Sequence, residues 1–155
     1  MKMQSFPQPC WPDKDRDDVT PGLCLLSALT ASELGEALSP SQARGFYLAI
    51  GKRFAALEPL EGVTDLAVLS TRTNTFWRTL GWGSVEIEAG AQAIAVRHHH
   101  APLAIPGGNP KHWRPALQAL LEGAYDAWFR ALGSGPALTT VSEWKGDVLE
   151  LRHGR

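Results

Sequence analysis

A short joint at residues 79–84, Thr-Leu-Gly-Trp-Gly-Ser, separates two segments whose apolar residues follow different periods. Before the joint, apolar residues recur at helical spacing up to Phe76 and Trp77, and after it, residues 85–88 alternate between apolar and acidic side chains. A glycine after a helical pattern is typical of a helix C-terminus, and strict alternation is typical of a half-buried strand. We therefore expect a helix end, an anchoring indole and a strand start here, which indicates a structural role.

The length and charge of the chain limit the classes of protein to which it can belong. A chain of 155 residues has the size of one domain and buries enough surface to hold a core without metals or disulfides. Its 15 basic and 16 acidic residues nearly cancel, whereas a protein that binds nucleic acid normally presents a basic face. We therefore expect no nucleic-acid partner.

Cysteine usage and the N-terminal sequence predict a cytoplasmic location. Cys10 and Cys24 are the two cysteines, and their spacing fits neither a zinc site nor a redox motif. The N-terminus lacks the apolar stretch of a signal peptide and carries a charged run at residues 13–18 instead. No segment approaches the roughly twenty apolar residues that a membrane-spanning helix needs, so we expect a protein that does not span a membrane.

Proline content divides the chain into an arm and a domain. Residues 1–22 hold four prolines beside the charged run, which predicts an extended arm, and residues 23–155 predict a single α+β domain. We expect helices packed on an antiparallel four-stranded sheet, in the order α-α-α-β-β-α-β-β. The expected helices cover residues 23–38, 40–57, 64–80 and 113–132, and the expected strands cover 85–89, 94–100, 138–144 and 147–152.

The second expected helix has a clear beginning and two unusual glycines. Ser39 followed by Pro40 is a typical helix start, because serine caps the free amides and proline fits the first turn. Gly45 and Gly51 then interrupt the apolar spacing, and each costs about 1 kcal/mol relative to alanine in a helix interior. We expect the close approach of another helix to offset this cost.

The segment Arg-His-His-His at residues 97–100 is the most prominent candidate for a metal site. Alternate strand residues point to opposite sides, so His98 and His100 would share a face. A third ligand would have to come from His112, Glu86 or Glu88. A stable site needs three or four converging ligands, so we interpret the segment as a polar strand end and expect no metal.

The remaining reactive side chains do not combine into a catalytic site. Cys10 and Cys24 lie in no motif that would activate a thiol, and no glycine-rich nucleotide loop occurs. Glu122 lies beside the apolar stripe of the fourth expected helix, without a second carboxylate to form a catalytic pair. We therefore expect no catalytic residues and no cofactor, and we expect Glu122 to hydrogen-bond near the 79–84 joint.

The joint and the fourth expected helix together define a structural motif. We expect the joint to be the packing node where the third helix meets the first hairpin, against side chains of the fourth helix. The motif consists of Gly81, Trp82, Gly83, Glu122, Gly123 and Tyr125.

Three segments of the chain resemble the D-subunit family of bacterial cellulose synthases, and they follow one another as they do in that family. Residues 80–88, Leu-Gly-Trp-Gly-Ser-Val-Glu-Ile-Glu, resemble the helix-to-strand joint of that family. Residues 113–129, with the core Leu-Glu-Gly-Ala-Tyr-Asp-Ala-Trp, resemble its C-terminal helix, and residues 45–53 are similar to its second helix. The proline-rich arm departs from the family's short N-terminal segment.

The resemblance implies a non-catalytic accessory subunit of the bacterial cellulose synthase complex. It implies dimers that assemble into a ring-like octamer, which gives passage to nascent β-1,4-glucan chains and helps cellulose to leave in ordered form. The implied partners are further copies of the chain, the other synthase subunits and the glucan. No glucan-contacting residue is transferred, because the family's N-terminal segment is the part associated with glucan passage. The alternative is a small dimeric ligand-binding or adaptor domain with the layout of the vinyl-reductase-type and TRAPP-like group.

Overall fold

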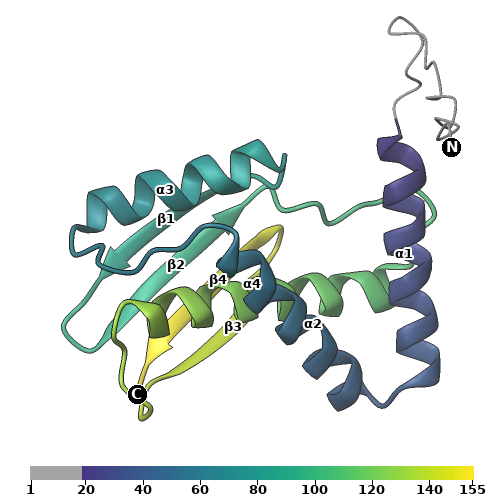
Figure 1. The fold of residues 1–155 in the computed structure, drawn as a ribbon. Coiled ribbons are helices and arrows are strands. Elements are labelled where there is room, and N and C mark those ends of the chain that lie inside the picture. Colours follow the sequence, from purple (N-terminus) through teal and green to yellow (C-terminus); the bar gives the residue numbers. More distant parts are fainter. Residues whose placement is uncertain (1–18) are drawn as a thin grey trace, which may run out of the picture.

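The computed structural model describes residues 19–155 (Figure 1). Residues 1–18 of the expected arm (1–22) lie outside the described residues. The first helix begins at Thr20, earlier than the expected start at residue 23. Pro21 stands in its first turn, where an amide has no partner within the helix, so the proline extends the helix instead of ending it.

The predicted element order is confirmed over the described residues. The helices are α1 (Thr20–Ala37), α2 (Pro40–Ala56), α3 (Leu66–Thr79) and α4 (Pro110–Ala131). The strands are β1 (Ser84–Ala89), β2 (Ala93–His99), β3 (Thr139–Lys145) and β4 (Val148–Gly154). Helix α4 begins before the expected residue 113, because the Asn109 side chain caps it by accepting a hydrogen bond from the Lys111 amide at 3.0 Å.

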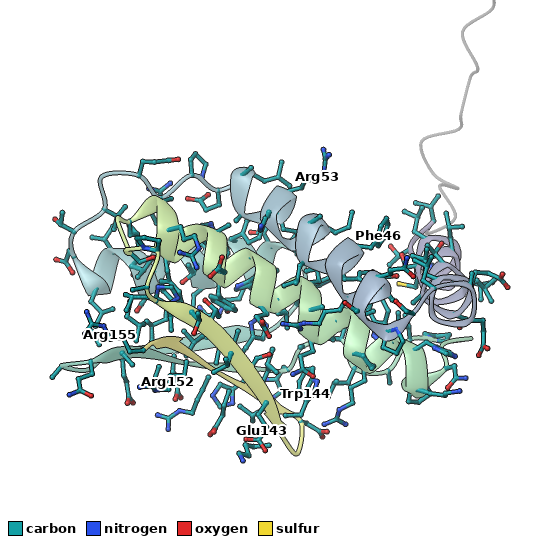
Figure 2. The ribbon with its side chains drawn as sticks, turned by 90° about the horizontal axis from the view of Figure 1, so that it is seen from below. Phe46, Arg53, Glu143, Trp144, Arg152 and Arg155 are labelled. Atoms are coloured by element: carbon teal, nitrogen blue, oxygen red, sulfur yellow. The ribbon has the colours of Figure 1, made fainter. Side chains whose placement is uncertain are left out.

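The predicted α+β class is also confirmed. The four strands form one antiparallel sheet in the order β1-β2-β4-β3. Helices α3 and α4 cover one face of this sheet, with α3 beside β1 and α4 beside β3 and β4 (Figure 1). Figure 2 shows α4 between α2 and the sheet, so α2 forms an outer layer that packs on α4.

Alternation along the strands separates a buried face from an exposed one. Val85 and Ile87 of β1 point toward the helices and are buried, whereas the glutamates between and after them are exposed. The buried strand residues meet an aromatic cluster from α3 and α4, in which Trp77, Tyr125 and Trp128 are almost completely buried. The indole nitrogen of Trp128 donates hydrogen bonds to the carbonyl oxygens of Ala55 and Glu58, which ties the cluster to the end of α2.

One of the two α2 glycines has the predicted role and the other does not. A Cβ atom on Gly51 would lie 1.9 Å from the carbonyl oxygen of Leu120 in α4. Gly123 of α4 faces α2 in return, and a Cβ atom there would lie 2.3 Å from the carbonyl oxygen of Leu48. Gly45 has no atom of another element within 4 Å of such a position, because it lies on a different face of α2. The prediction for Gly45 is therefore wrong.

Candidate functional site

The 79–84 joint has the geometry that its two glycines indicate. Gly81 has φ 69°, its amide donates to the Arg78 carbonyl oxygen at 3.0 Å, and the Trp82 amide donates to the Trp77 carbonyl oxygen at 2.8 Å. These two bonds form a Schellman motif, which ends α3. Gly83 has φ 89°, and a Cβ atom there would lie 1.9 Å from the carbonyl oxygen of His99. Both glycines are required for the chain to turn from α3 into β1.

The Trp82 indole is half-buried and belongs to an aromatic stack. Its ring lies nearly parallel to that of Trp77, with ring centroids 5.9 Å apart and planes 8° apart. The Phe54 ring of α2 lies 5.3 Å from it. Trp77 is completely buried, so it is the deeper anchor of the two indoles.

Truncation of Trp82 tests the joint as a packing node. We expect Trp82→Ala to lower the free energy of unfolding by about 2 kcal/mol, because half of a large aromatic surface and one stacked pair are lost. Urea denaturation followed by circular dichroism measures the change. A variant within about 0.5 kcal/mol of wild type, as is usual for surface changes, would show that the indole is not an anchor.

His98 occupies a position that differs from the polar strand end expected from the sequence. It is completely buried beneath the joint, with Nδ1 2.7 Å from the Tyr125 hydroxyl and Nε2 2.7 Å from the Trp82 carbonyl oxygen. A carbonyl oxygen only accepts, so Nε2 carries the proton and donates, and Nδ1 accepts from the hydroxyl of Tyr125. Burial lowers the pKa of His98 to about 4, so its imidazole is neutral.

The histidines of the metal-site hypothesis lie in different surroundings. His98 and His100 do not share a face, because β2 ends at His99 and His100 has a positive φ of 59°. His112 lies elsewhere, with Nε2 2.8 Å from a carboxylate oxygen of Glu36. Within residues 19–155, no group of three or more histidine, cysteine, aspartate or glutamate side chains is arranged to hold a metal ion. The sequence signal for the burial of His98 was its parity with the apolar residue Val96 on the same strand.

Glu122 does not lie at the joint, so its predicted position is wrong. One of its carboxylate oxygens accepts a hydrogen bond from Arg44 of α2 at 2.5 Å, and the other accepts one from the Ser142 hydroxyl of β3 at 2.6 Å. Glu122 and Tyr125 differ in direction around α4, so Tyr125 points toward β2 and Glu122 points into the gap between α2 and β3. Of the α4 residues in the predicted motif, Tyr125 alone is linked to the joint, through His98.

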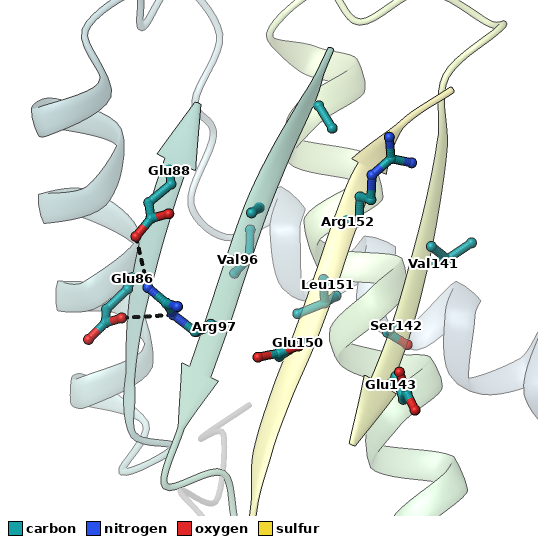
Figure 3. A pocket seen from close by; sticks show the side chains of 12 residues that line it. Glu86, Glu88, Val96, Arg97, Val141, Ser142, Glu143, Glu150, Leu151 and Arg152 are labelled. Atoms are coloured by element: carbon teal, nitrogen blue, oxygen red, sulfur yellow. Dashed lines mark hydrogen bonds and ion pairs between the residues drawn. The ribbon is translucent and has the colours of Figure 1, made fainter. Parts of the chain in front are cut away.

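A second candidate surface is the sheet face that the helices leave free, which we term the open sheet face. Side chains of all four strands alternate outward onto it, and the antiparallel register aligns them in two rows. The first row is Glu86, Arg97, Glu150 and Glu143, and the second row is Glu88, Ala95, Arg152 and Val141. These rows line a shallow groove of about 720 Å³ (Figure 3).

The charges on the open sheet face are only partly paired. Arg97 donates from Nε to Glu86 at 3.0 Å and from Nη2 to Glu88 at 2.8 Å (Figure 3). Glu143 pairs with Lys145 at 2.7 Å, and Glu150 lies opposite Glu143 in the register, where like charges repel each other. The groove therefore presents an excess of carboxylate oxygens, which accept hydrogen bonds, beside two guanidinium groups, which donate them.

These features define a small α+β protein with a polar groove on the open face of its sheet and with His98 and Glu122 engaged in contacts within the protein. The chain belongs to the cellulose synthase D-subunit family, because the model of that family matches residues 23–153 of the 155. None of the curated proteins matches the chain significantly. The family match gives the chain a role in the cellulose synthase complex. No helix of the described part, residues 19–155, is long and apolar enough to cross a membrane.

Proposed function

We propose that this chain is a non-catalytic accessory subunit of a bacterial cellulose synthase complex, located on its cytoplasmic side. It assembles with further copies of itself into a ring-like octamer that guides nascent β-1,4-glucan chains and promotes their ordered export. The observation that carries the proposal is the family match over residues 23–153. Two side chains support a non-catalytic role, because both ring nitrogens of His98 and both carboxylate oxygens of Glu122 are engaged within the protein.

The open sheet face is the proposed glucan-contacting surface. A polymer that moves along a protein has to be held weakly at many places, which requires a shallow surface with many exchangeable hydrogen bonds. The two rows of the open sheet face supply carboxylate acceptors and guanidinium donors for sugar hydroxyls, and most of these side chains are exposed. This assignment adds to the family resemblance, which transfers no glucan-contacting residue.

Deletion of the gene tests the proposed function in the producing bacterium. We expect glucan synthesis by isolated membranes to continue in part, because the catalytic subunit is intact, and we expect the secreted fibres to lose order. Radiolabel incorporation measures synthesis, and X-ray diffraction with electron microscopy measures fibre order. The proposal fails if deletion changes neither the amount of cellulose, nor fibre order, nor the placement of the synthase.

Complementation of the deletion strain tests the open sheet face separately. The double variant Arg97→Ala, Glu150→Ala removes charges at the centre of the first row and leaves the core untouched. The matched control is Arg53→Ala on the outer side of α2, far from the sheet (Figure 2). We expect the control to restore fibre order and the double variant to restore it incompletely. Equal restoration by both variants would remove the open sheet face from the proposal.

One observation favours the alternative, a small dimeric ligand-binding domain. A pocket of about 620 Å³ lies between α1, α2 and α4, which is the size of a small-molecule site. The Tyr47 side chain lines this pocket and is 8% exposed, and burial raises the pKa of its hydroxyl. Native mass spectrometry separates the two functions, because a dimer that carries a bound ligand supports the alternative and a larger ring supports the scaffold.

A further inference from the structure

Helix α1 has apolar side chains on two opposite faces. Its inner face, with the buried Ala28 and Ala31, packs on the rest of the molecule. Its outer face carries leucines that are 49% to 62% exposed, namely Leu23, Leu26 and Leu29. We term these three residues the outer leucine face, whereas Leu25 lies close to Gly107 in the loop before α4. A helix that is apolar all round is normally covered on all sides, so a partner for this face is missing from the single chain.

The composition of α1 limits the chemistry of that partner. Residues 20–37 contain no lysine or arginine, and their charged residues are Glu33 and Glu36 near the C-terminal end. Helices that bind membrane surfaces carry basic residues that attract anionic lipids, so the composition of α1 argues against a membrane. An uncharged leucine face fits an apolar protein surface of the same kind.

The polar groups beside the outer leucine face are already satisfied. The Ser27 hydroxyl donates to the Leu23 carbonyl oxygen at 2.9 Å, and the Thr30 hydroxyl donates to the Leu26 carbonyl oxygen at 2.8 Å. A buried hydroxyl without a hydrogen-bond partner costs free energy, and burial of this face leaves neither hydroxyl unpaired. The face can therefore be buried in an interface.

We propose that the outer leucine face packs against the same face of α1 in a second copy of the chain, with the two helices antiparallel. This inference rests on the proposed self-assembly and assigns one of its contacts. An uncharged face is complementary to itself, as a two-fold contact requires. The antiparallel arrangement also places Glu33 of each copy near the N-terminal end of the partner helix, where the helix dipole attracts negative charge.

The dimensions of the surface are sufficient for such a contact. Helix α1 is 18 residues long, which corresponds to about 27 Å at the usual helical rise. A stable interface buries about 800 Å² on each partner, and a contact along this length of helix contributes to that area.

Opposite charge substitutions test both the contact and the identity of the partner. We prepare one double variant, Leu26→Glu with Leu29→Glu, and a second, Leu26→Lys with Leu29→Lys, and measure their masses by light scattering. Each variant alone is expected to lose the wild-type assembly, with a mass at least about two-fold lower, because like charges meet at the two-fold contact. An equimolar mixture is expected to regain the larger mass, because opposite charges then face each other across two copies of α1.

The control and the other outcomes separate this inference from the proposed function. Leu57→Glu changes a leucine that is 72% exposed at the end of α2 and is expected to keep the wild-type mass. Circular dichroism confirms that all variants are folded. If both double variants keep the wild-type mass, the α1 contact is wrong and the proposed assembly stands. If both dissociate and the mixture does not recover, α1 does not face α1. If the wild-type chain is a monomer at every concentration, both proposals are wrong.

Discussion

Replacing Gly51 with alanine is expected to lower the free energy of unfolding by about 3 kcal/mol or more. The new Cβ atom would lie 1.9 Å from the Leu120 carbonyl oxygen and 2.8 Å from the Ala124 amide nitrogen, both in the backbone of α4. A backbone carbonyl in the middle of a helix cannot move aside, so α2 and α4 have to separate. This separation also loosens the contact at Gly123, where a Cβ atom would lie 2.3 Å from the Leu48 carbonyl oxygen.

The same helix provides a matched control for this prediction. Gly45→Ala is expected to raise the free energy of unfolding by about 0.5–1 kcal/mol, because alanine favours the helix and its Cβ atom meets no other element. Urea denaturation of both variants, followed by circular dichroism, gives the two changes from one experiment. If both substitutions shift stability in the same direction, the close crossing of α2 and α4 is not a constraint.

The two glycines illustrate what a sequence predicts and what it leaves open. Helical periodicity showed that both lie inside α2, and their cost indicated a helix crossing. The direction of the crossing depends on which face of α2 meets α4, and this is a property of the assembled layers rather than of α2 alone. The position of Glu122 also depends on how the layers assemble. The sequence predicts a contact with the 79–84 joint, whereas in the structure Glu122 lies between Arg44 and Ser142.

Local signals were sufficient for the elements themselves. The Ser39-Pro40 start, the Gly81 stop and the alternation in residues 85–88 each depend on neighbouring residues alone, and each is present in the structure. The open sheet face and the outer leucine face were not predicted as surfaces. The open sheet face follows from the strand order, which brings together residues that are distant in the sequence, whereas the outer leucine face consists of neighbouring residues whose exposure follows from the position of α1.

Acid is expected to destabilise the protein through His98. The pKa of His98 is about 4 in the folded protein, because burial penalises the charged ring, and about 6.5 in an unfolded chain. Between these values the unfolded chain binds a proton that the folded protein does not bind. The contribution of His98 to the free energy of unfolding is therefore complete above about pH 6.5. It is lost progressively as the pH falls to about 4, and the total loss is about 3 kcal/mol.

His153 acts in the same direction, because burial also lowers its pKa. The contribution of His98 alone is obtained by comparing wild type with His98→Gln at a series of pH values, using urea denaturation. Glutamine keeps a donor for the Trp82 carbonyl oxygen and has no titrating ring, so the variant is expected to lose less stability between pH 6.5 and 4 than wild type. Parallel losses in both proteins would show that another group carries the acid sensitivity.

The wild-type titration also tests the link between the joint and the sheet. A proton on Nδ1 of His98 removes the acceptor for the Tyr125 hydroxyl, whose pKa burial raises well above its usual value, so that hydroxyl keeps its own proton. The hydroxyl oxygen would then have to accept from Nδ1, 2.7 Å away, and its own buried hydrogen would lose the acceptor it has at neutral pH. Nitrogen NMR of His98 should therefore show the proton on Nε2 at neutral pH, and double protonation should coincide with unfolding rather than precede it.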